Sequence, residues 1–276
     1  MNFKNYKTIF CTAAAVTFLG AAAFCGFKIY SHYQQIDEQT EAFAEIAEVV
    51  ENAEPEEEPP RDKDTPVSEG EDILAKYKEL YLQNEDMVGW IAIDGTGINY
   101  PVMQSKNNPN FYLKHSFEKE YSDLGVPYIQ EDCDLAASDN LVIYGHHIKG
   151  GRMFGALHAY AKERYYKKHP EIQFRAGQEK RAYEIISVIQ TDISSPVYSF
   201  VDTGNHEEYR ENVRKILLGS LYRTEMVGQI EKSMEEESKD VFFRKYQFLT
   251  LSTCRSWAGH NQRLLVVAAK ERETEQ

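Results

Sequence analysis

Three residues with complementary chemistry stand at the ends of apolar segments that have the pattern of strands. Cys254 follows the apolar run from Phe248 to Thr253, and His146 follows the run from Leu141 to Gly145. Arg263 lies nine residues after the cysteine and opens a further apolar run. A cysteine supplies a thiol nucleophile, a histidine transfers protons, and a guanidinium stabilises a developing oxyanion. The three residues therefore predict nucleophilic catalysis by a thiol.

The histidine and the arginine each have a neighbour that competes for the same role. Side chains alternate along a strand, so Tyr144 and His146 share one face while His147 points to the other, and only one histidine can face the cysteine. Arg255 follows the cysteine directly, so its side chain also projects to the opposite face if the strand continues. We therefore expect Arg263 to act, because its planar fork of donors suits an oxyanion and a peptide carbonyl.

Each of these residues also has a structural interpretation. A cysteine in an apolar strand is most often a small buried hydrophobe, and an arginine can belong to a surface ion pair. Cys254 stands where its strand pattern stops, polar Ser252 shares its face, and a nearby cation favours the reactive thiolate. The histidines without a cysteine or carboxylate cluster beside them are His115, His158, His169, His206 and His260. No His-x-x-x-His spacing occurs, and we predict no catalytic metal and no cofactor.

The segment around the cysteine resembles the signature of a known family. Thr250-Leu251-Ser252-Thr253-Cys254 resembles the Thr-Leu-X-Thr-Cys motif of sortases, the cysteine transpeptidases of Gram-positive surfaces, and Arg263 has a spacing similar to that of the family's arginine. Tyr144-Gly145-His146 resembles the strand that bears the family's histidine, which selects His146 over His147. The resemblance covers roughly Ile73 to Lys270. The segments that resemble the opening of the class B subfamily are Gly89-Trp90-Ile91, Tyr100-Pro101-Val102 and Phe111-Tyr112-Leu113.

The resemblance implies a reaction and its partners. Cys254 would attack a backbone carbonyl of the sorting signal of a surface protein, His146 would protonate the leaving amine, and Arg263 would steady the oxyanion. An amine acceptor, either a peptidoglycan precursor or a pilin lysine, would resolve the thioester. Class B enzymes are often tied to Asn-Pro-X-Thr-Asn-like signals or to haem-uptake and pilin substrates, and the sequence does not choose among them. The residues implied to line the peptide groove are Leu113, Tyr144 and Ser252.

The elements that must position these residues are mostly short strands. Turn signals such as Asp94-Gly95 separate the apolar segments, and many strands with few long helices favour a mainly β fold, a closed barrel of about eight strands. Glu207 to Tyr222 has the clearest internal helical pattern, with an apolar stripe that ends at Leu221. A helix between the sixth and seventh strands is a known feature of class B sortases. The expected strands are Gly89–Ile93, Ile98–Met103, Val126–Gln130, Leu141–Gly145, Glu171–Ala176, Ala182–Thr191, Gln247–Thr253 and Leu264–Lys270.

The charge of the 276-residue chain is unevenly distributed. The formal net charge is −13, of which residues 37–64 carry −10, while residues 1–36 carry +3. Residues 65–276 are therefore only mildly acidic, at −6. No basic stripe is visible, so we expect no nucleic-acid partner.

The four cysteines do not form the pattern of a disulfide-rich protein. Cys11 and Cys25 lie in an apolar N-terminal segment, which leaves Cys133 and Cys254 for the globular part. A bridge between these two is the alternative to a free nucleophile. Cys133 stands among Glu131, Asp132 and Asp134 in what we expect to be an exposed loop, which argues against a buried bridge.

The N-terminal segment has the composition of a membrane anchor. Ile9 to Phe27 is 19 residues long and carries no charge, and Lys4 and Lys7 precede it. The positive-inside bias predicts a cytoplasmic N-terminus and an extracellular remainder, and the family resemblance also implies an anchor. The alternatives are a leader cleaved after Ala21-Ala22-Ala23 and, less favoured, a lipoprotein at Cys25.

These patterns divide the chain into three parts. Residues 1–30 would be the cytoplasmic tail and anchor, residues 31–69 an acidic stalk, and residues 70–276 the catalytic domain. Within the stalk, Ser31 to Glu51 is predicted to be helical, and the Pro-rich run Glu54 to Pro60 an extended spacer. Glu71 to Leu82 is predicted to be an amphipathic helix that opens the catalytic domain.

Two other functions compete with a sortase-like activity. A surface cysteine endopeptidase of the papain type would place its cysteine before its histidine, and here the order is reversed. A caspase-like enzyme would place the two residues about half as far apart as the 108 residues seen here. A non-catalytic anchored binding protein would leave Cys254 inert to thiol reagents.

Overall fold

The computed structural model describes residues 3–52, 75–177, 179–255 and 261–272. The chain divides into two compact units, residues 1–46 and residues 47–276, and each is described by itself. The first unit lies within helix α1 (Phe3–Asn52), so the apolar segment and the helix predicted at Ser31–Glu51 are parts of one continuous helix. The predicted spacer from Glu54 to Pro60 lies outside the described residues.

Helix α1 has the character of a membrane span. Among the described residues it is the one helix that is long and apolar enough to cross a bilayer, over Phe10–Glu48. A signal sequence near the N-terminus has the same character, so anchoring belongs to the proposal below.

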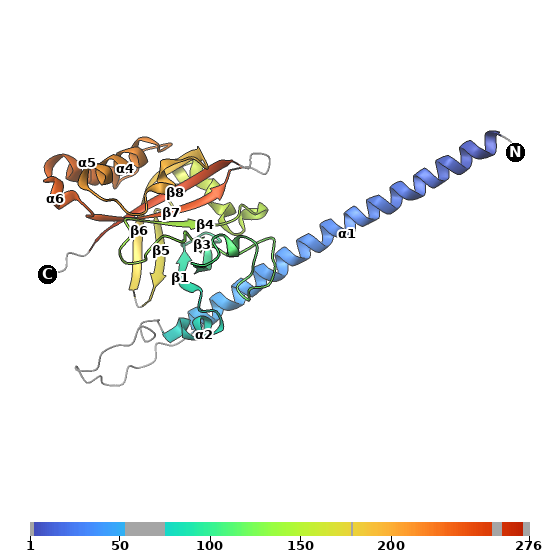
Figure 1. The fold of residues 1–276 in the computed structure, drawn as a ribbon, viewed down its shortest axis with the longest axis horizontal. Helices are drawn as coiled ribbons and strands as arrows, with labels where there is room; N and C mark the ends of the chain where they lie inside the picture. Colours follow the sequence, from blue (N-terminus) through green and yellow to red (C-terminus); the bar gives the residue numbers. More distant parts are fainter. Residues whose placement is uncertain (1–2, 53–74, 178, 256–260, 273–276) are drawn as a thin grey trace. The chain divides into compact units, whose positions relative to one another are not determined.

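The second unit is built around a closed barrel (Figure 1). The described residues form eight strands, ordered β1-β2-β3-β4-β7-β8-β6-β5, and β5 pairs with β1 to close the barrel. Two neighbouring pairs are parallel, β2 with β3 and β4 with β7, and the other pairs are antiparallel. The prediction of a closed eight-stranded barrel is confirmed. The strands are β1 (Met87–Ala92), β2 (Asn99–Met103), β3 (Tyr128–Ile129), β4 (Asn140–Tyr144), β5 (Glu171–Ala176), β6 (Glu179–Asp192), β7 (Tyr246–Cys254) and β8 (Gln262–Glu271).

Strand β7 lies between β4 and β8. All its residues from Tyr246 to Thr253 are buried, and only Cys254 at its end is partly exposed. The buried residues include polar ones: Gln247, Thr250, Ser252 and Thr253. Thr250 Oγ1 donates to Asn140 Oδ1 at 2.9 Å, whereas Thr253 Oγ1 is buried without a hydrogen-bond partner among the described residues.

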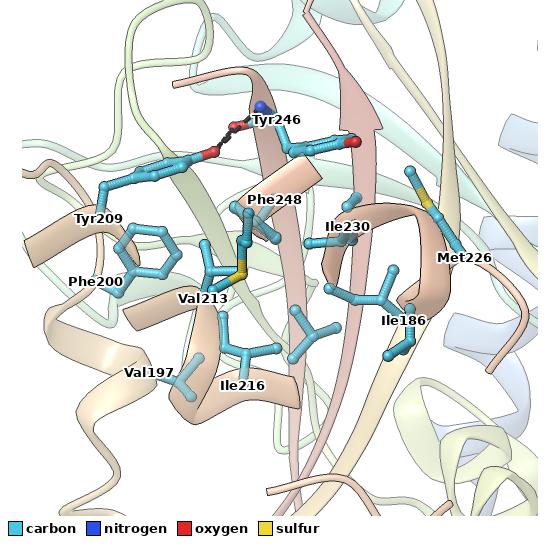
Figure 2. Close-up of a cluster of buried hydrophobic side chains, with 14 of the residues drawn as sticks. Ile186, Val197, Phe200, Tyr209, Val213, Ile216, Met226, Ile230, Tyr246 and Phe248 are labelled. Carbon is cyan, nitrogen blue, oxygen red and sulfur yellow. Dashed lines mark hydrogen bonds between the residues drawn. The ribbon is translucent and has the colours of Figure 1, made fainter. Parts of the chain in front are cut away.

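A layer of helices covers one face of this sheet, between β6 and β7 in the chain. Figure 1 shows α4 (His206–Leu218), α5 (Val227–Glu236) and α6 (Lys239–Phe242) grouped beside the barrel. The Asn205 side chain caps α4 by accepting from the backbone N–H groups of Glu207 and Glu208. In Figure 2, the Tyr209 hydroxyl from α4 donates to the backbone carbonyl of Tyr246 at 2.7 Å, which ties the helix layer to the start of β7. The labelled side chains of this buried cluster are Ile186, Val197, Phe200, Tyr209, Val213, Ile216, Met226, Ile230, Tyr246 and Phe248.

The helical layer corrects two expectations. The helix predicted at Glu207–Tyr222 is present but ends at Leu218, because Ser220 forms a bridge with Ile189 of β6, and Leu221 is 44% exposed outside the helix. Helix α5 follows without a counterpart in our sequence expectations. At the N-terminal side, the helix predicted at Glu71–Leu82 corresponds to α2 (Ala75–Gln83), and residues 71–74 lie outside the described part.

Several short helices connect the strands. Three of them carry residues to the end of β7: η1 (Phe111–Leu113), η3 (Phe154–Ala161) and η4 (Pro196–Ser199). The others are η2 (Lys149–Gly151) and α3 (Glu163–Tyr166).

Candidate active site

Cys254 and Arg263 lie directly opposite each other at the end of the barrel. Strands β7 and β8 are antiparallel, and their register pairs Cys254 with Arg263. Opposed residues in such a pair project to the same face of the sheet, so the thiol and the guanidinium share a face. Arg263 is partly exposed, and its Nη1 donates to the carbonyl of the adjacent Gln262 at 3.1 Å.

His146 follows the end of the strand on the other side of β7. Strand β4 runs parallel to β7 with Tyr144 opposite Ser252, so Tyr144 lies on the face that carries Ser252 and Cys254. The Gly145 N–H still donates to the Ser252 carbonyl at 3.1 Å. Strand β4 ends at Tyr144, and His147 pairs with Met153 instead of β7. The register therefore brings together Cys254 and Arg263, and His146 stands two residues beyond the end of the neighbouring strand.

The imidazole of His146 is oriented by a backbone carbonyl. His146 Nε2 lies 2.8 Å from the carbonyl oxygen of Leu113 in η1. A carbonyl can only accept, so Nε2 carries a proton and Nδ1 is the ring nitrogen left for chemistry. Burial lowers the pKa of His146, the cation of Lys114 lowers it further, and the Leu113 hydrogen bond and Asp123 oppose this shift. The imidazolium form of His146 is thus a stronger acid than an ordinary imidazolium.

The position of the Leu113 carbonyl depends on a glycine. Gly125 has a positive φ of 60°, and a Cβ at this position would stand 2.3 Å from the Tyr112 carbonyl oxygen and 2.8 Å from that of Leu113. The next residue, Val126, donates its backbone N–H to the Tyr112 carbonyl at 3.0 Å. Only glycine allows this close backbone approach, which holds η1 under His146.

A row of aromatic side chains lies beside the thiol. The Tyr144 ring packs against Tyr128 at 5.4 Å and against Tyr198 at 5.9 Å between ring centroids. The Tyr198 hydroxyl hydrogen-bonds to Ser252 Oγ at 2.8 Å. Burial raises the pKa of Tyr128 and Tyr198, and both pKa values also respond to the charges of Arg263 and Cys254, so these tyrosines lie within electrostatic range of both groups. Tyr128 and Tyr198 were not among the residues expected from the sequence.

Two histidines that the sequence placed outside the chemistry also lie at Cys254. His158 Nε2 is 2.9 Å from the backbone carbonyl oxygen of Cys254, and its ring stacks on that of His147 at 4.0 Å between centroids. His147 is half-buried. His158 is separated from Cys254 by 96 residues, so no local pattern could reveal the contact.

Cys133 corrects an expectation about its loop. Glu131, Asp132 and Asp134 are exposed as expected, but the Cys133 side chain turns inward and is only 4% exposed. Its Sγ contacts the carbonyl of Asn140 at 3.6 Å, and burial raises the pKa of its thiol to about 12. Cys133 and Cys254 are both free, so they do not bridge each other. Burial makes Cys133 a poor nucleophile, whereas Cys254 is partly exposed.

The sequence and the fold match a family of known proteins. The model of the sortase domain matches residues 91–271 of the chain. Sortase B of Staphylococcus aureus is 30% identical over 201 residues, which cover 72% of this chain and 76% of that protein.

This chain belongs to the sortase family. Solved structures agree: sortase B of Clostridium perfringens has a TM-score of 0.59 at 28% identity, covering 70% of this chain and 97% of that one. A Staphylococcus aureus sortase B solved with its substrate has a TM-score of 0.69 at 23% identity, covering 87% of this chain and all of that one, and supports the fold. The chain is a class B sortase, and sortases are cysteine transpeptidases.

Family membership decides between the functions left open by the sequence. A papain-like or caspase-like endopeptidase and a non-catalytic binding protein are set aside, because the match runs from within β1 to the end of β8 and includes Cys254. Among the described residues of this sortase, no three His, Cys, Asp or Glu side chains gather as metal ligands would.

Proposed function

We propose that this sortase cleaves the sorting signal of secreted proteins at Cys254 and joins the product to an amine on the cell surface. The observation that carries the proposal is the register of three adjacent strands. It pairs Cys254 with Arg263 across β7 and β8, and His146 follows the end of β4, the strand that pairs with β7 on its other side. Cys254 is also the one residue of β7 that is partly exposed.

The proposed reaction has two steps, formation of a thioester and its attack by an amine, and each passes through a tetrahedral intermediate. Cys254 Sγ attacks the carbonyl carbon of the scissile peptide bond, and the Arg263 guanidinium stabilises the oxyanion. As the C–N bond breaks, the leaving amine takes a proton from His146 Nδ1, and a thioester links the peptide to Cys254. An acceptor amine then attacks the thioester, returns a proton to Nδ1, and releases the thiolate with a new amide.

The hydrogen bond to Leu113 gives His146 a single working nitrogen. Because Nε2 donates to the Leu113 carbonyl, the proton for the leaving group must come from Nδ1. Both nitrogens carry protons only in the imidazolium form. The lowered pKa of His146 makes this form a stronger acid than an ordinary imidazolium, which favours proton transfer to the departing amine.

The peptide groove is proposed to run along the tyrosines next to the thiol. Tyr144 and Ser252 face the same side as Cys254, and Tyr198 covers Ser252 through their hydrogen bond. The flat faces of these rings suit an extended peptide, and their hydroxyls supply polar contacts. Leu113 belongs to this groove through η1, whose carbonyl also orients His146.

The cellular setting follows from helix α1. A single apolar helix near the N-terminus, with Lys4 and Lys7 before it, favours an anchor with a cytoplasmic N-terminus and an extracellular barrel. The acceptor would then be a peptidoglycan precursor or a pilin lysine, both of which present a primary amine outside the cell.

The test is a cleavage assay on the full chain in detergent micelles with a library of Asn-Pro-X-Thr-Asn peptides. We expect the wild-type chain to cleave at least one peptide, and Cys254→Ala to lose roughly a thousandfold or more of that rate. Cys133→Ala is the matched control, and we expect it to keep the rate because its thiol is buried. Retained turnover in Cys254→Ala would falsify the assignment of the nucleophile.

A second arm separates transfer from hydrolysis. Triglycine or a lysine side-chain amine is added to the same reaction, and the products are identified by mass spectrometry. The proposal requires an amide between the cleaved peptide and the added amine. Free acid as the sole product at every amine concentration would identify a hydrolase instead.

A further inference from the structure

Two histidines outside the proposed reaction, His147 and His158, lie next to the backbone of Cys254. His158 in η3 donates its Nε2–H to the carbonyl oxygen of Cys254 at 2.9 Å. The proposed reaction gives this histidine no task. Its ring is part of a stacked pair with His147, which directly follows His146 in the chain.

The hydrogen bond from His158 takes the place of a missing backbone donor. Along the parallel pair of β4 and β7, the Gly145 N–H donates to the Ser252 carbonyl. The next donor of a continued ladder would be the His147 N–H, directed at the Cys254 carbonyl. The chain leaves the ladder at this point, because His147 pairs with Met153 in an antiparallel bridge. The imidazole of His158 therefore supplies the hydrogen bond to the Cys254 carbonyl that β4 no longer provides.

The other end of the same peptide bond is also fixed. The backbone N–H of Arg255 donates to the Gln262 carbonyl at 3.0 Å. The peptide plane that follows Cys254 is therefore held on both sides, by His158 at its carbonyl and by β8 at its N–H. A planar peptide held at two points restricts rotation about the Cα–C bond of Cys254, and with it the direction of the thiol.

His147 in turn holds the ring of His158. The two imidazoles stack at 4.0 Å with an interplanar angle of 25°. His147 Nδ1 is buried with no hydrogen-bond partner among the described residues, so packing against His158 accounts for its position. Burial and the neighbouring His158 lower the pKa of His147, which keeps this half of the stack uncharged near neutral pH.

We propose that His158, held by His147, is a positioning residue that fixes the backbone of Cys254 and so aims the thiol between His146 and Arg263. The inference rests on the proposed role of Cys254 as the nucleophile. It assigns the consecutive histidines two different tasks: His146 transfers protons on one face, and His147 supports the nucleophile from the other.

The test compares three variants of the full chain in detergent micelles. His158→Phe keeps a flat ring for the stack and removes the donor, whereas His158→Gln keeps an N–H donor at similar reach. The matched control is His169→Phe, because His169 also hydrogen-bonds a backbone carbonyl, that of Asp94 at 2.7 Å, and packs on the Tyr165 ring. The readouts are kcat and KM for the cleaved peptide, the melting temperature, and the rate at which iodoacetamide alkylates Cys254.

We expect His158→Phe to lower kcat about tenfold with KM changed less than about twofold, because misdirection of the attacking atom acts on the chemical step. His158→Gln should recover most of kcat, and His169→Phe should match the wild type. A wild-type kcat in His158→Phe contradicts the inference. So does an equal loss in both His158 variants with a fall in melting temperature, which would show a merely structural side chain.

Failure of the proposed function would look different. The wild-type chain would then cleave no peptide, and the alkylation rates would decide the inference alone. A changed alkylation rate in His158→Phe, restored in His158→Gln, supports positioning of the thiol. Equal rates in all four proteins contradict it.

Discussion

Cys254 and Arg263 are paired across β7 and β8, and His146 follows the neighbouring strand β4, although 108 residues separate the histidine from the cysteine. Each residue stands at or just beyond a strand end, where the backbone is still held by the sheet and the side chain is no longer covered by it. This position combines a fixed direction with access for a substrate, which is what nucleophilic attack requires.

Arg263 is expected to act through its geometry as well as its charge. Arg263→Lys keeps the cation and loses the planar fork of donors. Removal of one oxyanion donor costs about 2.7–4 kcal/mol in other enzymes, so we expect kcat to fall roughly a hundredfold to a thousandfold. Steady-state cleavage kinetics measure this, with Arg255→Lys as the control near the wild-type rate. A larger loss in the Arg255 variant would reverse the assignment.

The pKa of His146 is expected to respond in opposite directions to two neighbouring charges. Lys114 lowers this pKa and Asp123 raises it, and the two side chains form an ion pair at 2.8 Å. Lys114→Ala should therefore raise the pKa of His146, and Asp123→Asn should lower it. NMR titration of the His146 ring protons measures both shifts. Shifts of the same sign in the two variants would show that the ion pair acts through structure and not through charge.

At the scale of residues, the sequence predicted the candidate catalytic side chains but not the side chains that contact them. The roles proposed for Cys254, His146 and Arg263 could be read from strand ends, alternation and a family motif. His158 could not be predicted, because its contact with Cys254 joins residues 96 positions apart and has no local signature. The inward turn of Cys133 was missed because three exposed acids around it hide a single buried side chain.

At the scale of elements, the barrel shows how one face of a sheet changes from core to active site. Along β7, Tyr246 and Phe248 lie in the cluster under α4 and α5, Ser252 lies under Tyr198, and Cys254 follows on the same face. The helical layer therefore anchors one end of β7 while the other end carries the thiol. The strands were predicted because alternation and turn signals are local. Helix α5 was missed, although Val227, Ile230 and Met234 have helical spacing and are buried.

The turn at Gly125 offers a test of how one element positions another. Gly125→Ala places a Cβ against the carbonyl oxygens of Tyr112 and Leu113 at a positive φ, so we expect a loss of about 2–4 kcal/mol in the free energy of unfolding. The displaced Leu113 carbonyl should also lower kcat through His146. Denaturant unfolding and cleavage kinetics measure the two effects.

The matched control for this variant is Gly150→Ala. Gly150 has a positive φ of 82° but nothing within 4 Å of an added Cβ. Because of backbone strain alone, Gly150→Ala should lose about 1–2 kcal/mol in the free energy of unfolding, and it should keep its kcat. Equal effects at the two glycines would mean that the close approach at Gly125 does not position His146.

At the scale of the whole molecule, the chain combines an apolar helix, an acidic segment and a barrel. Residues 37–64 carry a net charge of −10, and few apolar side chains follow Val50 in this segment. Residues 37–52 of this segment belong to helix α1. We infer that the segment is a tether and contributes nothing to the groove.

A shorter chain that begins near Glu69 tests this inference. It should fold and cleave a soluble peptide about as fast as a chain that begins near Ser31, with rates equal within about twofold, because the barrel holds all the proposed site residues. In cells the shorter chain should fail, since the anchor raises the effective concentration of membrane-bound substrate and acceptor. A large drop in the soluble assay would move the boundary of the catalytic domain toward the N-terminus.

The central claim is that a thioester forms on Cys254 and on no other residue. The most direct measurement is mass spectrometry of the full chain, quenched in acid during cleavage of a sorting peptide and then digested for peptide mapping. The proposed mechanism requires the N-terminal fragment of the substrate on the peptide that contains Cys254, and its release by hydroxylamine. Cleavage without an adduct on Cys254, or with an adduct on another residue, would contradict the mechanism.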